Sequence, residues 1–393
     1  MEIKEKIIEV VDSLAGTLIK LSHEVHDSPE LGLNEFKAAK WQTELLKEHG
    51  FSVTMPFCGM DTAYNAVKGT VGEGPQIAFL SEYDALKGLG HACGHNIICA
   101  ASCGAAIALS KALEGEKACI YVFGTPAEET QGGKIPMVEQ GAFDGLDCAM
   151  MVHPKPNENT VGGGGLACTD ITVEFFGKDA HSSRPMLGIN ALTSTITLFN
   201  SVNAQLHLWP NKSKMNGIII SGGEASNIIP GYSSCKFTMR AERKDQIIAM
   251  YDDFVRLANA AAATTGAKVK ITHIPIFAER YSNRTLDEAF TANMKTLGED
   301  CHWQDPEAMT GSSDIGNVSL VIPTIHEYLS LNAGDISEHT PAFCKAAETK
   351  RADDVVLLAA KGLAMTGADV FSSGDVRLAM KKEFEEEVLP HKC

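Results

Sequence analysis

Apolar side chains recur at helical spacing over the first fifty residues of the chain. One face of the first segment carries Ile7, Ile8, Val11, Leu14, Leu18 and Leu21. The segment from Phe36 to Leu46 repeats this pattern and ends before Gly50. Steps of three and four residues return to the same side of a helix, and a glycine commonly follows a helix end. We therefore predict two helices at the start of the chain.

The pattern then changes to short apolar runs with helical segments between them. The runs at 76–86, 118–129 and 147–154 begin with apolar residues and finish in polar ones, and a helical pattern covers 96–113. Strands that alternate with helices form parallel βαβ units, whose active sites gather beyond the carboxyl ends of the strands. The polar residues that end these runs are therefore the candidates for a functional site.

A glycine run from Gly162 to Gly165 marks a break in the pattern. Beyond it the order is strand, helix, strand, strand, helix, strand, over the segments 171–177, 189–206, 217–223, 234–242, 245–262 and 268–276. This βαββαβ order is typical of a ferredoxin-like domain of about 110 residues. The run is more typical of a hinge than of a phosphate-binding loop, because no helix start with Lys-Ser or Lys-Thr follows it.

After about residue 280 the first style of pattern returns. We predict a helix over 285–297, a strand that ends near Pro323, and a helix from Ala342 to about Thr366. The fold class is therefore α/β with two domains. An α/β domain over 1–167 and 281–393 is interrupted by a lid-like ferredoxin-like insertion over 168–280. A chain of 393 residues is also long for a single core.

Composition narrows the class of protein. Apolar residues at 44% and charged residues at 21% are typical of a soluble protein, and the net charge of −16 argues against nucleic-acid binding, which needs a clustered basic face. No stretch approaches the roughly 18 apolar residues of a membrane span, and the N-terminus has no signal-peptide pattern. We expect a cytoplasmic protein that binds neither nucleic acid nor a membrane.

Eleven cysteines are scattered through the predicted strands and helices. Without an export signal, we expect them to stay reduced. Those that lie in apolar runs are predicted to be small buried side chains: Cys99, Cys103, Cys119, Cys148 and Cys235.

Three short clusters carry the residue types that bind divalent metal ions. They are Cys93 with His95, the pair Glu128 and Glu129, and His153. Thiolate, imidazole and carboxylate groups all bind zinc-like ions. Two adjacent glutamates repel each other unless a cation lies beside them. We predict that one glutamate binds metal and that its neighbour transfers protons, as in hydrolytic metal sites.

Each cluster also has a simpler interpretation. A free cysteine is usually a core thiol, a glutamate pair is usually solvated, and a single histidine is more often structural. A cysteine hydrolase that uses Cys93 and His95 is a second alternative, although residues two apart on a short turn are poorly placed as nucleophile and base. A non-catalytic protein that binds metal or small peptides is a third.

Motifs along nearly the whole chain resemble the M20 family of metallopeptidases and amidohydrolases. In order they are LSHEVHDSPELGLNEFKAA, EYDAL, HACGHN, GTPAEE, MVHP, GKDAHSSRP, GGEASNIIP and GSSDIGNVSLVIPTIHEYL. The resemblance is strongest to the amidohydrolase branch of the family, and within it to a group of dipeptidases and aminobenzoyl-glutamate hydrolases. Asn96 departs from the CGHD motif of many members of the branch. The CGHN motif of this chain is instead similar to the motif found in this group of dipeptidases and aminobenzoyl-glutamate hydrolases.

The resemblance implies a site for two divalent metal ions. Its ligands would be Cys93, His95, Glu129, His153 and His339. Glu128 would be the general base and acid, and Asp84 would orient a neighbouring ligand. Zinc, manganese and cobalt are all possible ions, and a thiolate ligand suits zinc.

The resemblance also implies that the inserted domain is a lid through which the chain forms a homodimer. His181 would reach the partner subunit's site and stabilise an oxyanion there. Asn227 and Arg240 would hold the carboxylate of the substrate. His326 is a candidate for lining the pocket, and an equal alternative is a strand-end residue packed in the core.

The implied reaction is hydrolysis of an amide bond in a dipeptide or N-acyl amino acid with a free C-terminal carboxylate. Dipeptidases of this group favour a basic C-terminal residue, the aminobenzoyl-glutamate hydrolases take an acidic one, and plant-type members take acyl or auxin conjugates. The negative net charge slightly favours a cationic substrate through electrostatic steering.

Overall fold

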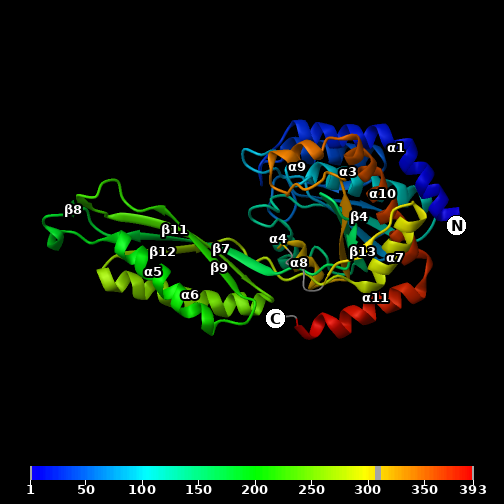
Figure 1. Ribbon diagram of the computed structural model, residues 1–393. Coiled ribbons are helices and arrows are strands. Elements are labelled where there is room, and N and C mark those ends of the chain that lie inside the picture. Colours follow the sequence, from blue (N-terminus) through cyan, green and yellow to red (C-terminus); the bar gives the residue numbers. More distant parts are fainter. Residues whose placement is uncertain (1, 306–310, 392–393) are drawn as a thin grey trace. The chain divides into compact units, whose positions relative to one another are not determined.

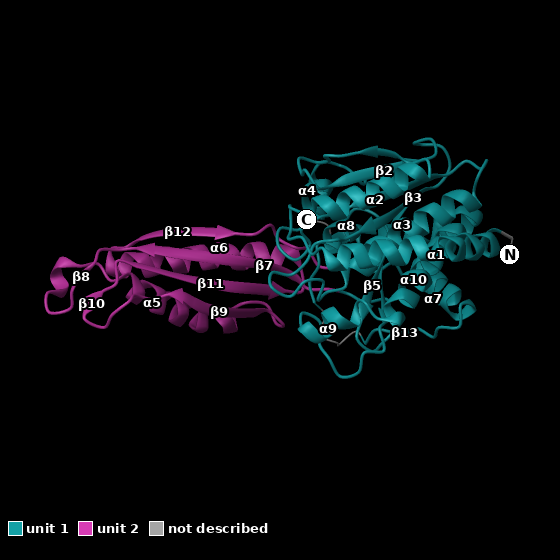
Figure 2. Ribbon diagram, turned by 90° about the horizontal axis from the view of Figure 1, so that it is seen from above, with its two compact units in different colours: residues 1–164, 280–392 teal, residues 165–279, 393 magenta. Residues whose placement is uncertain are grey.

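The computed structural model describes residues 2–305 and 311–391, and the chain divides into two compact units (Figure 2). The first unit contains residues 1–164 and 280–392, and the second contains residues 165–279. The chain therefore leaves the first unit at the end of the glycine run and returns to it at Arg280. The boundaries expected from the sequence, 167/168 and 280/281, lie within three residues of these positions.

Eight strands form a mixed sheet in the first unit (Figure 1). They are β1 Ser52–Thr54, β2 Tyr64–Lys68, β3 Gln76–Ser81, β4 Cys119–Gly124, β5 Cys148–Lys155, β6 Thr160–Val161, β13 His302–Trp303 and β14 Thr324–Ser330. Their order is β1-β2-β4-β3-β5-β14-β6-β13, and the pairs from β4 to β14 are parallel. The three predicted apolar runs thus become neighbouring parallel strands, and their carboxyl ends meet at one edge of the sheet.

Helices cover both faces of this sheet. They are α1 Glu2–Asp27, α2 Phe36–Glu48, α3 His95–Ala112, α4 Lys134–Glu139, α7 Arg284–Thr296, α8 Ile315–Ser319, α9 Pro341–Ala346, α10 Lys350–Ser372 and α11 Gly374–Glu387, with a 3-10 turn at Leu389–His391. Ile77 and Phe79 of β3 pack in one core with α1, α3 and α10, whereas Ala78 and Leu80 pack in another with α4 and α8. Successive side chains of a strand point to opposite faces, so a strand buried on both is apolar throughout.

The second unit is a ferredoxin-like domain, as predicted. Its main elements are β7 Ala167–Phe176, α5 Ala191–Gln205, β9 Lys214–Ser221, β11 Tyr232–Ala241, α6 Lys244–Thr265 and β12 Lys268–His273. Shorter elements are β8 Ala180–His181, β10 Ile228–Ile229 and 3-10 turns at Pro185–Leu187 and Leu206–Leu208. The antiparallel sheet has the order β12-β7-β11-β9. Phe175 and Phe237 of the sheet pack with Leu198 of α5 and Phe254 of α6, so both helices cover one face (Figure 1).

Two predicted elements near the end of the chain are wrong. The strand predicted to end near Pro323 instead begins after it, at Thr324, and α8 precedes it. Proline has no N–H to donate, so it stands before the hydrogen-bonded ladder and not within it. The helix predicted from Ala342 to about Thr366 is two helices, α9 and α10, because the Thr349 side chain accepts from the Ala352 N–H and starts a new helix.

The five cysteines predicted to be core residues are fully buried and unpaired. Burial raises the pKa of the Cys103 thiol to about 12. A thiol with so high a pKa carries almost no thiolate, so these side chains act as small apolar groups.

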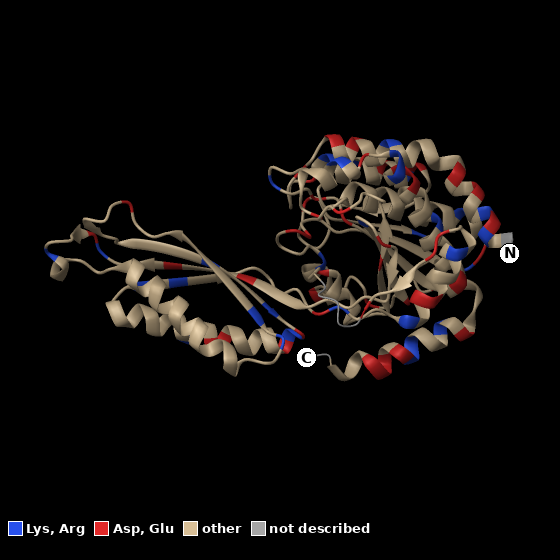
Figure 3. Ribbon diagram, viewed as in Figure 1, with Lys and Arg blue, Asp and Glu red and all other residues tan. Residues whose placement is uncertain are grey.

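Within the described part of the chain, α10 is the one helix long and apolar enough in composition to cross a membrane. In the protein, 67% of the most apolar stretch of α10 is buried, because α10 packs against α1 and α3. Burial in the core accounts for this hydropathy. By contrast, acidic and basic side chains are interspersed along α11, a pattern typical of a solvated helix (Figure 3).

Candidate metal centre

The side chains predicted to bind metal lie in the first unit, at the carboxyl end of its parallel strands. Cys93 and His95 stand at the start of α3, Glu129 follows β4, His153 lies near the end of β5, and His339 precedes α9. Because β4, β3 and β5 are neighbours in that order, the loops after them share one edge of the sheet. The structure therefore brings together residues that are far apart in the sequence.

Two backbone contacts hold these loops together. Gly94 has a φ of +76°, and a Cβ atom there would lie 2.4 Å from Cγ of Pro154. Glycine is thus required for the Cys93 loop to approach β5 this closely. The backbone N–H of His339 donates to the carbonyl oxygen of Ala92 at 2.9 Å.

The potential ligand atoms form two overlapping groups. Cys93, His95 and His153 place their atoms within 4.8 Å of one another, and so do Cys93, Glu129 and His339. Cys93 belongs to both groups, and its Sγ lies 3.4 Å from Nε2 of His153. The first group offers the Cys93 sulfur and two imidazoles, and the second offers the same sulfur, a carboxylate and an imidazole. These donor sets suit zinc-like ions.

Hydrogen bonds on the outer side of the histidines orient them. Nδ1 of His95 donates to the carbonyl oxygen of Asp84 at 2.9 Å and to its Oδ1 at 3.1 Å. Nδ1 of His153 donates to the carbonyl oxygen of Pro154 at 2.7 Å. Asp84 also accepts from the backbone N–H of Glu129 at 3.0 Å. The Nε2 atoms of both histidines therefore face the candidate ligand groups, and Asp84 positions two candidate ligands at once.

The buried charges and unpaired atoms of this centre fit a divalent cation. Nε2 of His95 and Oε1 of Glu129 are buried and have no hydrogen-bond partner among residues 2–305 and 311–391. His339 Nε2 lies 3.3 Å from Glu129 Oε1. Burial would raise the pKa of Glu129, and the nearby His339 and His95 instead lower it to about 2. A buried carboxylate oxygen and a buried imidazole nitrogen that lack hydrogen-bond partners among the described residues are costly unless a cation joins them.

Glu128 lies in the same region, and its proton affinity differs from that of Glu129. Its side chain lies within 4.8 Å of the potential ligand atoms of Glu82 and His95. Burial, and then the charges of Glu82 and Glu129, raise the pKa of Glu128 well above its ordinary value. A glutamate that readily accepts a proton beside a ligand group is suited to general acid–base catalysis.

A fully buried ion-pair network beside the centre was missed by the sequence analysis. Nζ of Lys134 lies 2.6 Å from Oε1 of Glu82 and 2.5 Å from Oδ1 of Asp314. The other oxygen of Glu82 lies 3.5 Å from Nε2 of His95. Burial would lower the pKa of Lys134, but Asp314 and Glu82 raise it above its ordinary value. The sequence contains one indication of this network, since Glu82 stands two residues before Asp84 at the same strand end.

His326 lies on β14 beside the centre. Its ring centroid is 5.5 Å from that of His153, and its side chain is 3% exposed. Its Nδ1 accepts a hydrogen bond from the guanidinium of Arg280, a residue that the sequence analysis also missed. Nothing in the local pattern around Arg280 distinguishes it from an exposed arginine.

The remaining predicted site residues lie in the second unit. His181 pairs with Ile228 between β8 and β10, and the carbonyl oxygen of Asn227 accepts from Ser182 N–H at 2.9 Å. His181 and Asn227 therefore lie together at one end of the unit, next to the start of β11. Arg240 lies at the other end of β11, roughly 26 Å further along the strand at about 3.3 Å per residue.

Known proteins show the same sequence pattern. Residues 165–265 match the peptidase dimerisation domain of M20 peptidases. The Xaa-Arg dipeptidase of Mus musculus is 35% identical over 399 residues, which cover 98% of this chain and 92% of that protein. The chain belongs to the M20 family. This M20 protein is therefore a hydrolase that acts on amide bonds, as the resemblance implied.

Two more comparisons describe the range of M20 relatives. A p-aminobenzoyl-glutamate hydrolase chain of Escherichia coli (strain K12) is 25% identical over 471 residues, covering all of this chain and 97% of that protein. A dinuclear metal-binding M20 peptidase from Bacillus subtilis has the same fold, with a TM-score of 0.67 and 21% identity over 92% of this chain and 99% of that one. The predicted fold class is thereby confirmed.

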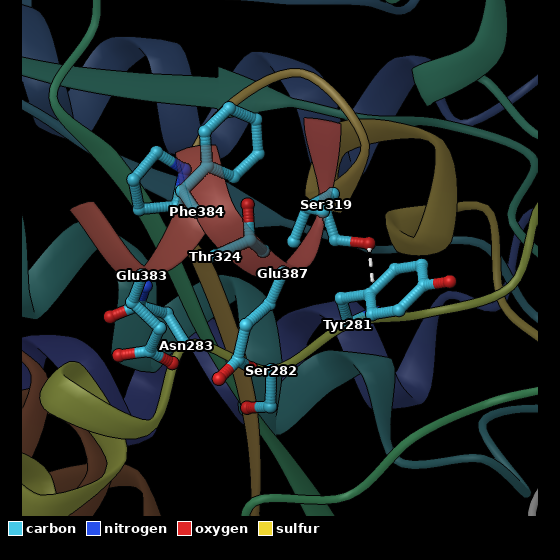
Figure 4. A pocket seen from close by; sticks show the side chains of 10 residues that line it. Tyr281, Ser282, Asn283, Ser319, Thr324, Glu383, Phe384 and Glu387 are labelled. Carbon is cyan, nitrogen blue, oxygen red and sulfur yellow. Dashed lines mark hydrogen bonds between the residues drawn. The ribbon is translucent and has the colours of Figure 1, made fainter. Parts of the chain in front are cut away.

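The described residues that line a small cleft elsewhere in this M20 protein carry structural polar groups only (Figure 4). It lies between α11 and the start of α7. Glu383 in its wall accepts from the N–H and the hydroxyl of Thr285 at 3.0 and 2.7 Å, so it caps α7. Ser319 accepts from the N–H of Tyr281 at 3.1 Å. These groups hold the chain in place and do not form a second ligand set.

Proposed function

We propose that this M20 protein is a dinuclear metal-dependent dipeptidase that cleaves the amide bond before a C-terminal residue with a free carboxylate. The observation that carries the proposal is the pair of ligand groups that share Cys93, with His95 Nε2 and Glu129 Oε1 left without partners in the described chain. In this arrangement Cys93 would belong to the ligand sets of both metal ions. His95 and His153 complete one set, and Glu129 and His339 complete the other.

The chain supplies proton transfer and orientation. When bound, the two metal ions polarise the substrate carbonyl and acidify a water molecule. Glu128 would take a proton from the attacking water, whose oxygen adds to the carbonyl carbon, and would deliver that proton to the nitrogen as the C–N bond breaks. Asp84 holds His95 and Glu129 in place, and Lys134 keeps the carboxylate of Glu82 fixed beside them.

A homodimer through the second unit is part of the proposal. β9 is an edge strand whose Ile218, Ile219 and Ile220 are 58%, 46% and 58% exposed, and an exposed apolar edge is a pairing surface. Asn227 and Arg240 lie too far apart on one subunit to hold the same carboxylate. A second copy would let Asn227 of one subunit and Arg240 of the other act on one substrate, with His181 stabilising the oxyanion.

We propose a basic C-terminal residue in the substrate. Support comes from the Xaa-Arg dipeptidases of mouse and Homo sapiens, which are 35% and 32% identical over 98% of this chain. The net charge of −16 also favours the approach of a cationic substrate. The thiolate ligand favours zinc over manganese or cobalt, and a cytoplasmic location agrees with reduced cysteines.

Two alternatives compete with this function. Hydrolysis of aminobenzoyl-glutamate or another N-acyl amino acid is favoured by the 25% identity to the Escherichia coli hydrolase over the whole chain. A non-catalytic metal- or peptide-binding protein is the other alternative. Glu128 argues against it, because a binding protein needs no proton-transfer group.

The deciding experiment is a hydrolysis screen read by mass spectrometry. Dipeptides with basic, acidic and neutral C-terminal residues, N-acyl amino acids and aminobenzoyl-glutamate would be incubated with zinc, with manganese and with a chelator. We expect metal-dependent cleavage of dipeptides ending in arginine or lysine. Cleavage of the acidic or acylated compounds alone would select the first alternative, and no cleavage by metal-loaded protein would select the second.

A further inference from the structure

Arg280 makes a dense set of contacts where the chain re-enters the first unit. It is the first residue of the returning chain and is 8% exposed. Its Nε donates to the carbonyl oxygen of Gly163 at 3.0 Å, and Nη2 donates to that of Gly164 at 2.8 Å. The guanidinium thus ties the returning segment to the outgoing segment within the first unit.

The third nitrogen of this guanidinium faces β14. Nη1 of Arg280 lies 2.6 Å from Nδ1 of His326 and donates to the hydroxyl of Tyr328 at 3.0 Å. Guanidinium groups have only donors, so Nδ1 of His326 must be the acceptor and carries no proton. The ring is therefore neutral, with its one proton on Nε2.

The Nε2–H of His326 is a buried donor without an acceptor. No described residue accepts from it. The β14–β5 register pairs Tyr328 with His153, and His326 lies two residues away on the same face of β14. The ring centroids of His326 and Tyr328 are 5.5 and 5.8 Å from that of His153. A neutral donor thus lies directly beside a metal ligand and is unused by the chain itself.

We propose that His326 is a catalytic residue whose Nε2–H donates to the carbonyl oxygen of the scissile amide, and that Arg280 is the positioning residue that fixes this tautomer. The inference rests on the proposed amide hydrolysis. The hydrogen bond strengthens as negative charge develops on that oxygen, so it stabilises the transition state more than the substrate. No proton leaves the ring. This donor comes from the same chain as the metal ligands, which distinguishes it from His181 of the second unit.

Two substitutions at one position separate the donor role from a packing role. In His326→Gln the amide nitrogen takes the place of Nε2, so a donor remains. In His326→Asn the amide lies at the level of Nδ1, so the partner of Arg280 remains and the donor is lost. We expect kcat to fall by less than about tenfold for His326→Gln and by about 10² to 10³-fold for His326→Asn, as for removal of one oxyanion donor. Bound metal, measured by elemental analysis, should be unchanged in both.

The positioning role of Arg280 is tested by the tautomer itself, independently of turnover. In protein labelled with nitrogen-15 histidine, the resonances that disappear in His326→Gln identify this ring. We expect the wild type to show the Nε2–H tautomer, and Arg280→Met to show a mixture of both tautomers with a lower kcat. Arg280→Lys serves if the methionine variant does not fold, because one ammonium cannot make all four contacts. Arg284→Met, at an exposed arginine nearby, should leave the His326 signals unchanged.

The outcomes distinguish this inference from the proposed function. Equal loss of kcat in His326→Gln and His326→Asn, or loss of metal from His326→Asn, would overturn the donor role. An Nδ1–H tautomer in the wild type would overturn the role of Arg280, whether or not the protein hydrolyses anything. The expected tautomer in a protein that cleaves no compound of the screen would overturn the proposed function and the donor role with it, and would retain Arg280 as the residue that sets the tautomer.

Discussion

Adjacent glutamates in this protein have opposite proton affinities. Burial and the charges of Glu82 and Glu129 raise the pKa of Glu128, whereas His339 and His95 lower that of Glu129 to about 2. One peptide unit thus separates a carboxyl group that accepts a proton from a carboxylate that stays ionised. This difference supports the proposed division between proton transfer and metal binding.

Glu128→Gln tests that division. The amide cannot take a proton from water, so we expect kcat to fall by at least about 10² to 10⁴-fold. The metal content should stay at the wild-type value, because Glu129 and not Glu128 belongs to the two ligand groups that share Cys93. Elemental analysis and steady-state kinetics measure both quantities. Retained turnover would remove Glu128 from the mechanism.

Lys134→Met tests the buried network. Removing the ammonium leaves Glu82 and Asp314 buried without their shared cation, and breaking a buried ion pair in this way costs about 3–5 kcal/mol. Urea denaturation of the protein without metal measures the loss. Lys40→Met, which removes an exposed lysine of a helical pair, is the matched control and should leave the unfolding midpoint unchanged. An equally small effect of both substitutions would show that the network contributes little.

At the scale of elements, the start of α3 depends on one glycine. In Gly94→Ala the methyl group must occupy a left-handed backbone position 2.4 Å from Cγ of Pro154. We expect lower stability and weaker metal binding, because Cys93 and His95 flank this position. Gly298→Ala is the control, since its φ is also positive at +87° but its surroundings are open within 4 Å. It should cost only the backbone strain of about 1–2 kcal/mol and leave metal binding unchanged.

The contact between α7 and β14 contains a buried acid pair that makes stability depend on pH. Burial raises the pKa of Asp287 from 3.8 to about 6, and burial and Asp287 raise that of Glu327 above its ordinary value. The folded state therefore binds more protons than the unfolded state above pH 3.8. Stability from this pair is present below that pH and is lost as the pH rises through about 6.

Asp287→Asn should reduce this loss of stability. The amide keeps an acceptor for the hydroxyl of Ser282, which donates to Oδ1 of Asp287 at 2.7 Å, and carries no charge at any pH. Unfolding midpoints in urea at several pH values, with chelator present throughout, measure the effect. We expect a smaller decrease between about pH 4 and 6 than in the wild type. Parallel pH profiles of the two proteins would contradict this assignment.

At the scale of the whole molecule, the proposed dimer depends on the free edge of β9. Ile219→Lys places a charge on this edge and should convert the dimer to a monomer in light scattering at low micromolar concentration. Activity should fall in parallel if His181 and Asn227 act on the partner subunit. Thr272→Lys on β12, the opposite edge of the same sheet, is the control and should leave the dimer intact. A fully active monomer would exclude a shared site.

Much of this protein could be predicted from local sequence patterns. Helical and strand periodicities indicate which side chains are buried, so they predicted the α/β unit and the ferredoxin-like unit. The residue types at the ends of β4 and β5 indicated candidate ligands, and the structure brings these side chains together. Pro323 was misplaced because an apolar run by itself does not show on which side of a proline the strand lies.

The charge balance of the centre was decided only by the tertiary structure. Lys134 meets Asp314 across 180 residues and Glu82 across 52, and Arg280 meets His326 across 46. A lysine or arginine is buried only where distant segments supply its acceptors, and no periodic pattern encodes such a partner. The sequence by itself determined which elements form and which residue types stand at the strand ends. Packing decided which carboxylates stay ionised and which histidine nitrogen carries the proton, because both depend on charges brought close by the fold.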